Sequence, residues 1–267
     1  MDRISERESF TIKALVVRET DVRDNDKFLT LLTAERGRLS VYAHGVHGIK
    51  SPYVNICVLA SYNEFTIERR GERYTMKEAF QLEPFRALRD DLERFALAQY
   101  FCDVCSDVSV EGENESDLLA LTLNMLFALS ATIKPPRQIK AAFELRCACI
   151  LGVMPDLDAC AGCGCTDSPV MYLDVMSGVI RCAQCRAKQP LEELFYEDGK
   201  SVLTIELAPP VLDAMRYVVY AGLKRLCAFI MPDDASMRDF AEVCEKYLTS
   251  HLERGYKTLD FYKAVSG

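Results

Sequence analysis

Residues 28–43 read Phe-Leu-Thr-Leu-Leu-Thr-Ala-Glu-Arg-Gly-Arg-Leu-Ser-Val-Tyr-Ala. Strand-forming residues fill both ends of this stretch, Phe28 to Thr33 and Leu39 to Ala43, and the second end alternates between apolar and polar side chains. Glu35-Arg36-Gly37 lies between the two ends and marks a turn. The stretch therefore predicts a β-hairpin near the start of the chain.

Three further segments with a strand pattern surround the hairpin. Phe10 to Arg18 is rich in strand-forming residues, and we expect the polar cluster at residues 19–26 to end it. Tyr62 to Glu68 and Glu72 to Lys77 form a second pair, joined at Arg69-Arg70-Gly71, whose glycine can adopt a positive φ. About five short strands at this spacing fit a small barrel, for which we predict an OB-fold.

Beyond residue 80 the apolar period changes from two to near 3.6, which indicates helices. We expect the first helix to begin at about Leu82, with Pro84 in its first turn. Further helices are expected over residues 118–133, 137–151 and 209–226, and from an N-cap at Ser236. The remainder of the chain is therefore predicted to be mainly helical.

Four cysteines interrupt this helical part as two Cys-x-x-Cys pairs, Cys160 with Cys163 and Cys182 with Cys185. Each pair can place two sulfurs on one side of a tight turn, and the loop between the pairs lets them close a tetrahedron around one ion. Because protein fills all four positions, we predict one structural Zn²⁺, with free or redox-active thiols as the alternative. Cys165 offers a fifth sulfur, which is either a spectator or exchanges with Cys163.

The expected fold class is α+β: an N-terminal OB-fold β-barrel, then a mainly helical domain with an inserted four-cysteine zinc-binding module. The expected boundaries are 1–80 for the barrel, 81–155 and 191–267 for the two parts of the helical domain, and 156–190 for the zinc module. Cys102, Cys105, Cys147 and Cys149 lie in helical patterns and are expected in the core, with a redox role for the Cys102-x-x-Cys105 pair as the lesser alternative.

Composition limits the possible compartments and partners. The 267 residues carry 12 cysteines, and the charged N-terminus has no apolar signal core, so we expect a cytosolic protein with reduced thiols. No apolar run approaches the ~18 residues that a bilayer span needs. The net charge of -8 argues against general attraction to nucleic acid, but residues 1–80 carry 13 Lys+Arg against 12 Asp+Glu. A polyanion site is therefore expected in the barrel, as a local patch.

Basic residues cluster at two places in the predicted barrel, with tyrosines between them. The candidate DNA-binding residues are Arg36, Arg38, His44, Lys50, Arg69, Arg70 and Arg73, accompanied by His47, Tyr42, Tyr53 and Tyr74. OB-folds hold single strands with such cations and stack bases on such aromatic rings. The alternative is an ordinary solvated surface on which the arginines pair with Glu35, Glu68 and Glu72.

Catalytic signatures are missing from the sequence. The chain has no phosphate-binding loop, no dinucleotide fingerprint and no Gly-x-Ser-x-Gly elbow. His251-Leu252-Glu253 resembles the His-x-Glu of zinc deaminases but follows the cysteines instead of preceding them. Asp24 and Asp26 fit a solvated turn better than a carboxylate pair. We therefore expect a protein that is not an enzyme.

Residues 14–18 together with residues 26–46, Asp-Lys-Phe-Leu-Thr-Leu-Leu-Thr-Ala-Glu-Arg-Gly-Arg-Leu-Ser-Val-Tyr-Ala-His-Gly-Val, resemble the N-terminal signature of the bacterial RecO family. The order of barrel, helical domain and cysteine insertion is also similar to that family. Family members often carry Lys where this chain has His44.

The resemblance implies a non-enzymatic recombination mediator of the RecF-type pathway, nucleoid-associated in the cytoplasm. Such a mediator binds single- and double-stranded DNA, anneals complementary strands, and works with RecR to load RecA onto strands coated by single-stranded-DNA-binding protein. A groove of the helical domain would take the acidic C-terminal tail of that coating protein, with Arg137, Lys140 or Arg146 meeting its carboxylates. The rival interpretation is a zinc-ribbon protein–protein adaptor or transcriptional regulator, and a zinc hydrolase is a distant third because the four thiols leave no open ligand position.

Overall fold

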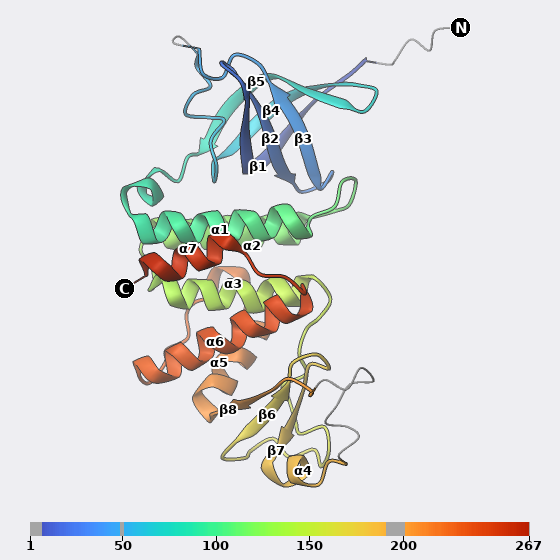
Figure 1. Cartoon of the computed structure of the whole chain (residues 1–267), viewed down its shortest axis with the longest axis vertical. Coiled ribbons are helices and arrows are strands. Elements are labelled where there is room, and N and C mark those ends of the chain that lie inside the picture. The colour runs from blue at the N-terminus through green and yellow to red at the C-terminus, as the bar shows by residue number, and fades with distance from the viewer. Residues whose placement is uncertain (1–6, 49–50, 191–200, 267) are drawn as a thin grey trace, which may run out of the picture. The chain divides into compact units, whose positions relative to one another are not determined.

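The computed structural model describes residues 7–48, 51–190 and 201–266 of the chain. These residues form two compact units, whose elements are labelled in Figure 1. Unit 1 runs to Ile133 and takes in the segment from Tyr256 onward, and unit 2 spans Lys134–Gly255. Within the described ranges, no helix combines the length and the apolar character that crossing a membrane requires.

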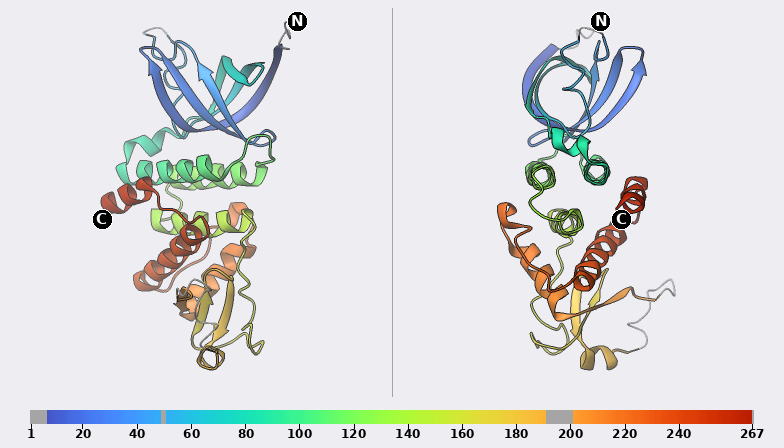
Figure 2. Two further views of the ribbon diagram at one scale, coloured as in Figure 1. Left: turned by 45° about the vertical axis from the view of Figure 1, so that its right-hand side comes forward. Right: turned by 90° about the vertical axis from the view of Figure 1, so that its left-hand side faces the viewer.

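Unit 1 begins with a closed five-stranded barrel. Its strands are β1 (Arg7–Arg23), β2 (Asp26–Thr33), β3 (Arg38–Ala43), β4 (Tyr62–Arg70) and β5 (Arg73–Glu83). They follow the order β1-β2-β3-β5-β4, and β4 pairs with β1 to close the barrel (Figure 2). Among these five strands, only the short β3–β5 pairing is parallel. The predicted α+β class and the OB-fold barrel are confirmed.

The first strand is longer than the sequence suggested, because it serves two neighbours. Residues 7–15 of β1 pair with β4 and residues 14–23 pair with β2, and the pairing with β2 has a register shift between Val16 and Arg18. Such a bulge bends a strand and helps a sheet to close. The prediction that the polar cluster ends this strand was wrong. Glu19 continues it because its carboxylate forms an ion pair with the buried Lys27 and accepts the Leu59 N–H at 3.0 Å.

Alternating side chains of the strands fill the barrel with a compact apolar core, which includes Leu29, Leu31, Val41, Phe65 and Ile67, all fully buried. Because consecutive strand residues point to opposite faces, the residues between these positions point outward. The outward positions of β2, β3 and β5 are therefore available for a binding surface.

The turn between β2 and β3 connects the barrel to the helices of unit 1. Gly37 has a φ of +58°, and a Cβ atom at this position would lie 1.8 Å from the carbonyl oxygen of Val110. The N–H of Arg38 donates to the same oxygen at 3.2 Å. Only glycine fits here, because the backbone adopts the left-handed region and another backbone segment lies against it.

The helices of unit 1 are η1 (Arg86–Asp90), α1 (Leu92–Val108), α2 (Ser116–Ser130) and α7 (Lys257–Val265). The expected helix start at Leu82 was wrong, because β5 continues to Glu83 and α1 begins only after Asp91, whose carboxylate accepts the N–H of Arg94 at 3.0 Å. The helix α7 packs along α1 (Figure 1). Just before α7, the Tyr256 hydroxyl donates to Asp107 at 2.9 Å.

Unit 2 combines helices with a small antiparallel sheet. Its elements are α3 (Pro136–Ile150), β6 (Met171–Asp174), β7 (Val179–Cys182), α4 (Ala183–Ala187), β8 (Thr204–Leu207), α5 (Pro209–Tyr220), η3 (Leu223–Arg225) and α6 (Asp234–His251). The strand order is β7-β6-β8, so the third strand comes from beyond the cysteine region. Asp233, and not Ser236 as predicted, caps α6: its carboxylate accepts the Ser236 N–H at 2.7 Å.

Candidate nucleic-acid interface and metal site

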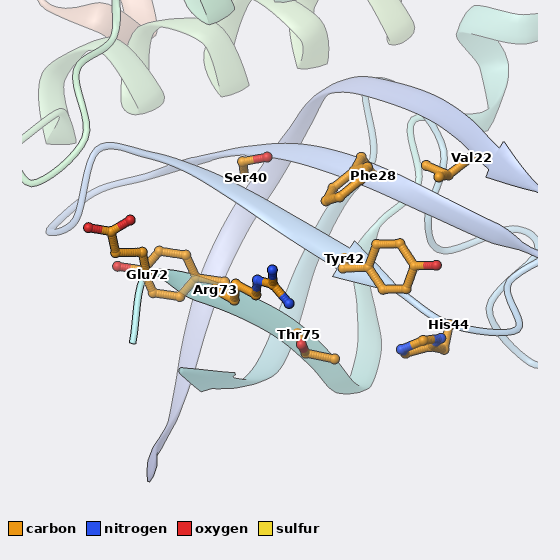
Figure 3. A pocket seen from close by; sticks show the side chains of 9 residues that line it. Val22, Phe28, Ser40, Tyr42, His44, Glu72, Arg73 and Thr75 are labelled. Atoms are coloured by element: carbon orange, nitrogen blue, oxygen red, sulfur yellow. The ribbon is translucent and has the colours of Figure 1, made fainter. Parts of the chain in front are cut away.

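A hollow of about 630 Å³ lies on the outer face of the barrel, where β2, β3 and β5 meet. Val22, Phe28, Ser40, Tyr42, His44, Glu72, Arg73, Tyr74 and Thr75 line it. Figure 3 shows Phe28, Tyr42 and His44 gathered on one side of the hollow and Arg73 on the other. The parallel pairing of Val41 with Tyr74 and of Tyr42 with Thr75 brings these strands together.

Three rings form a continuous group along one side of this hollow. Phe28 opposes Tyr42 across the β2–β3 ladder, and the two ring centroids lie 4.9 Å apart with the rings edge to face. The His44 ring follows at 4.5 Å from Tyr42. Phe28 is 43% exposed, so solvent reaches its ring beside the rings of Tyr42 and His44. This group offers apolar ring faces and edges to solvent.

Asp26 contacts two of the three rings, those of Tyr42 and His44. Its carboxylate accepts the backbone N–H of Gly45 at 2.8 Å and the hydroxyl of Tyr42 at 2.7 Å, and His44 Nδ1 lies 3.5 Å away. The Gly45 N–H and, after it, the Tyr42 hydroxyl hold the pKa of Asp26 below its ordinary value. Asp26 is thus an anion that orients the aromatic group, and the interpretation of residues 24–26 as a turn fits this role better than a carboxylate pair.

The predicted basic residues lie in different surroundings. Arg73 lines the hollow on the side opposite His44, whereas Arg69 and Arg70 are exposed at the β4–β5 turn, with Arg69 lying 5.7 Å over the Tyr74 ring. Arg36 lies 3.8 Å over the Phe10 ring and pairs with Glu8 at 3.1 Å.

Arg38 differs from the other arginines, because its Nη1 donates to the Ser106 carbonyl at 2.6 Å and ties β3 to the end of α1. Lys50 lies outside the described residues. His47 contacts the carboxylate of Asp21 at 2.9 Å, and Tyr53 packs against the barrel core.

Sequence reasoning missed the two phenylalanines of this surface. Phe28 was assigned only to a strand, although it occupies an outward position between the polar Lys27 and the buried Leu29 of an alternating strand. Phe10 lies between Arg36 and Tyr74, at 6.4 Å from the latter ring. An aromatic residue at an outward strand position was the available signal for Phe28.

The four cysteines of the two pairs converge in unit 2. The sulfurs of Cys160, Cys163, Cys182 and Cys185 all lie within 4.8 Å of one another, and those of Cys163 and Cys182 are 3.8 Å apart. A tetrahedron with Zn–S bonds of about 2.3 Å has S–S edges of about 3.8 Å. The group could therefore hold a metal ion of this kind.

Local structure explains how the two pairs meet. Cys182 ends β7 and immediately precedes α4, so the second pair forms at a strand-to-helix turn. The first pair is held against β7 because the Ala161 N–H donates to the Ile180 carbonyl at 2.8 Å. A Cβ at Gly162 would lie 2.9 Å from the Cys185 sulfur, so glycine is required where the two pairs approach.

Backbone donors prepare Cys160 to act as a thiolate ligand. Although burial raises the pKa of the Cys160 thiol, the N–H groups of Cys182, Gly162 and Cys163 together with the Cys163 side chain outweigh burial and lower it to about 6. The N–H···S distances are 3.2 Å from Cys182 and 3.4 Å from Gly162. Cys165 donates to Cys163, which raises the pKa of the Cys165 thiol to about 12. The Cys163 side chain likewise raises the pKa of the Cys185 thiol to about 12, so the directions of these shifts do not distinguish Cys165 from the pair ligands.

The other candidate positions have structural partners. Cys102 and Cys105 are fully buried in α1, and burial raises the pKa of both thiols, to about 12 for Cys105, which makes a redox role unfavourable. His251 Nε2 lies 2.9 Å from the Val175 carbonyl oxygen and donates to it. The likeness to a deaminase motif is therefore a chance match.

Two of the three basic residues considered for an acidic partner tail are engaged inside unit 2. Lys140 is 3% exposed and contacts the carboxylates of Glu144 and Glu245, each at 2.8 Å. Arg146 donates to the backbone carbonyls of Val218, at 2.6 Å, and Ala221. The expectation that Lys140 meets a partner was wrong, because periodicity alone did not place it on the buried face of α3; Arg146 is partly exposed, and the expectation for it stays a prediction.

Comparison with known proteins agrees with the order of barrel and helices. The family model described as Recombination protein O N terminal matches residues 8–85, and the one described as Recombination protein O C terminal matches residues 89–260. A protein named DNA repair protein RecO from Desulforudis audaxviator is 31% identical over 257 residues, covering 96% of this chain and 97% of the relative. One of the same name from Acetivibrio thermocellus is 29% identical over 251 residues, covering 94% and 95%.

Proposed function

The chain belongs to the RecO family of DNA repair proteins, and we propose on this basis that it acts as a non-enzymatic recombination mediator of the RecF-type pathway. In this proposal it binds single- and double-stranded DNA, anneals complementary strands, and helps RecR to load RecA onto strands coated by single-stranded-DNA-binding protein. The observation that supports the proposal most is the hollow of the barrel, where exposed rings lie beside basic side chains.

The aromatic group would receive the bases of a single strand. Phe28 and Tyr42 present apolar surface beside His44, and Arg73 lies across the hollow, where it can meet a phosphate. Stacking of a base on an aromatic side chain contributes about 1–3 kcal/mol and tolerates any sequence, because every base has a π-face. Binding through this surface would therefore depend weakly on sequence.

The phosphates would be held by the basic residues around the rings. The proposed DNA-binding residues are Arg36, Arg38, His44, Lys50, Arg69, Arg70 and Arg73, in the proposed OB-fold domain of residues 1–80. We expect Arg69, Arg70 and Arg73 to contribute most, since all three are exposed whereas Arg36 and Arg38 are only partly exposed. Affinity should fall steeply with salt, because phosphate contacts release counterions.

We propose that the four thiols bind one Zn²⁺ as a structural ion. Bound zinc would supply a cross-link between two loops and leave no position for water. The proposed module of residues 156–190 has one short sheet and few buried side chains, so metal binding would add to its folding free energy. The helical parts, proposed as 81–155 and 191–267, would supply protein contacts, including the acidic tail of the coating protein. Of the three basic residues considered, Arg137 and Arg146 are both partly exposed, and Arg146 already donates to backbone carbonyls.

Charge reversal at the β4–β5 turn tests the DNA-binding part of the proposal. The triple variant Arg69→Glu, Arg70→Glu, Arg73→Glu should lose most of its affinity for a labelled single strand at low salt, measured by fluorescence anisotropy. The control is Lys224→Glu, Arg225→Glu, Arg238→Glu, which changes the net charge equally at positions of unit 2 that are not fully buried. The proposal requires the control to keep its affinity.

Equal losses in both triples would indicate a general charge effect and not a site on the barrel. If neither the unchanged chain nor the variants bind DNA at low salt, the mediator proposal fails. A zinc-ribbon protein–protein adaptor, in which the barrel only packs against other elements, would then be the better account. Binding restricted to one duplex sequence would instead favour a transcriptional regulator.

A further inference from the structure

Three arginines lie side by side where β1 begins and β4 turns into β5. Arg7 is opposite Arg70 in the β1–β4 ladder, and Arg70 is opposite Arg73 in the β4–β5 ladder. Residues that are directly opposite in neighbouring strands project from the same face of a sheet. Arg7, Arg70 and Arg73 are all exposed and form one continuous row across three strands, called the arginine row below.

The arginine row concentrates positive charge on the sheet. Like charges directly opposite each other in neighbouring strands destabilise a sheet. Within the described part of the chain, no carboxylate forms an ion pair with Arg7 or Arg73. Glu68, the next residue on this face of β4 before Arg70, pairs with Lys77 at 3.4 Å. An anion bound along the row would compensate its charge.

The arginine row joins two hollows of the barrel. Arg73 lines the hollow of about 630 Å³ that holds the aromatic group, called the first hollow here. A second hollow of about 550 Å³ is lined by Arg7, Glu8, Arg69 and Gly71. The carboxylate of Glu8 is paired with Arg36 at 3.1 Å. The row thus offers positive charge between two places that can each receive part of one ligand.

We propose that a single strand of DNA runs from the first hollow along the arginine row to the second hollow, with successive phosphates on Arg73, Arg70 and Arg7. This inference rests on the proposed DNA binding of the barrel, and it adds Arg7 to the binding residues. The row recognises the phosphodiester backbone, because a guanidinium group can donate two parallel N–H bonds to phosphate oxygens. Such contacts position a strand without reading its sequence.

The path predicts that Arg7 contributes only to the binding of longer strands. A strand that fills the first hollow alone contacts the aromatic group but does not extend to Arg7 at the far end of the row. Single OB-folds bind between about 4 and about 16 nucleotides. Labelled thymidine oligonucleotides of about 4 and about 16 nucleotides therefore distinguish the first hollow from the whole path.

Substitution of Arg7 in the full-length chain tests the path. Anisotropy titrations over a salt series compare Arg7→Gln with the unchanged chain on both strands. For the longer strand, Arg7→Gln should weaken binding roughly three- to fivefold at low salt. It should also make the slope of log affinity against log salt shallower by about 0.7, the value for one lost phosphate contact on a single strand. Binding of the shorter strand should change by less than about twofold.

Lys13→Gln is the matched control. Lys13 is exposed on the same strand and the same face as Arg7, lies opposite Glu64 and lines neither hollow. Its substitution removes the same charge and should leave the binding of both strands unchanged. Arg7→Lys keeps a positive charge at position 7 and should retain the steep salt dependence.

The outcomes separate the path from the proposed function. If the unchanged chain binds neither strand at low salt, the DNA binding on which the path rests is refuted. If it binds both but Arg7→Gln keeps the salt slope, or weakens no more than Lys13→Gln does, DNA binding stands and the path is wrong. Equal losses for the shorter and the longer strand in Arg7→Gln would also overturn the path.

Photo-cross-linking of the unchanged chain gives a readout that does not depend on the folding of a variant. The longer strand carries a photoreactive nucleotide at one end or at the other, and mass spectrometry identifies the attached peptides. One end should attach to β2 or β3 at the first hollow, and the other end to the peptide that contains Arg7. Attachment of both ends at β2 and β3 would contradict the path.

Discussion

Replacement of Lys140 by methionine tests the interior of unit 2. The ammonium group of Lys140 contacts Glu144, whose side chain is fully buried, and Glu245, whose side chain is 19% exposed. Burial alone lowers the pKa of Lys140, but the charges of Glu144 and Glu245 outweigh burial and raise it. Methionine fills nearly the same volume without a charge, so Lys140→Met leaves the Glu144 carboxylate buried beside an apolar chain.

Removing one partner of a buried ion pair typically costs about 3–5 kcal/mol, because the remaining charge loses its compensation. The matched control is Lys246→Met in α6, which breaks the pair with Glu242 at 2.6 Å, where the two side chains are 48% and 62% exposed. An exposed pair of this kind contributes about 0.5 kcal/mol or less. The two substitutions have the same chemistry and differ mainly in burial.

Native-state hydrogen exchange of the α3 and α6 amides measures the local free energy of opening in both variants. We expect exchange to accelerate roughly 100-fold or more in Lys140→Met and less than about threefold in Lys246→Met. A raised Lys140 pKa means that its contribution is fully present below the pKa of an unfolded lysine and is lost only at higher pH. The contribution of Lys140 to the stability of the unchanged chain should therefore stay constant between about pH 5 and about pH 8.

The variant should behave differently with pH. Without the Lys140 ammonium, the Glu144 carboxyl would bind a proton more readily in the folded chain, so the defect of Lys140→Met should shrink as the pH falls from about 8 to about 5. Equal exchange rates in Lys140→Met and Lys246→Met would refute the assignment of Lys140 to the interior. That result would indicate that Lys140 lies at the surface, where its side chain could contact a partner.

Three further outcomes are expected in unit 1. Phe28→Ala should weaken binding to a single strand by roughly 5- to 150-fold in anisotropy titrations, through loss of stacking, whereas Phe80→Ala, 58% exposed on β5 but outside the hollow, should not; equal effects would contradict the stacking role. Gly37→Ala should lower the urea midpoint of barrel unfolding by more than Gly71→Ala does, because both glycines have a positive φ but only Gly37 faces a carbonyl oxygen. A larger loss in Gly71→Ala would contradict the structure. The Gly45 N–H and the Tyr42 hydroxyl lower the pKa of Asp26, so its contribution to stability is present above the ordinary carboxyl pKa of 3.8 and is lost as the pH falls through the lowered pKa. Asp26→Asn should therefore remove this part of the acid dependence of barrel unfolding, and an unchanged acid profile would refute the role of Asp26.

Local patterns predicted most of the barrel. Residues 28–43 alternate in hydrophobicity around one turn, so neighbouring residues alone specified the β2–β3 hairpin. The continuation of β1 through its polar cluster depends on the distant Lys27 and Leu59, which no local pattern indicates. The strand β8 and the helix α7 were also missed, since β8 pairs with a strand about thirty residues earlier and α7 packs on α1 from the far end of the chain.

The sequence predicted the metal site more fully than it predicted the basic surface of the barrel. The convergence of the four cysteines was predictable because the Cys-x-x-Cys spacing encodes the local geometry. Basic residues gave a weaker signal, since Arg38 and Arg73 look alike in sequence although one donates to a backbone carbonyl and the other lines the hollow. Only tertiary structure separates an arginine that supports the fold from one that faces a ligand.

The most direct test of the mediator proposal is annealing of two complementary labelled oligonucleotides that are pre-coated with single-stranded-DNA-binding protein. The full chain is added without nucleotide over a series of salt concentrations, with the triple variant Arg69→Glu, Arg70→Glu, Arg73→Glu in parallel. We predict that the unchanged chain accelerates annealing, that the acceleration weakens as salt rises, and that the variant loses it. No acceleration by the folded chain at low salt would contradict the proposed function.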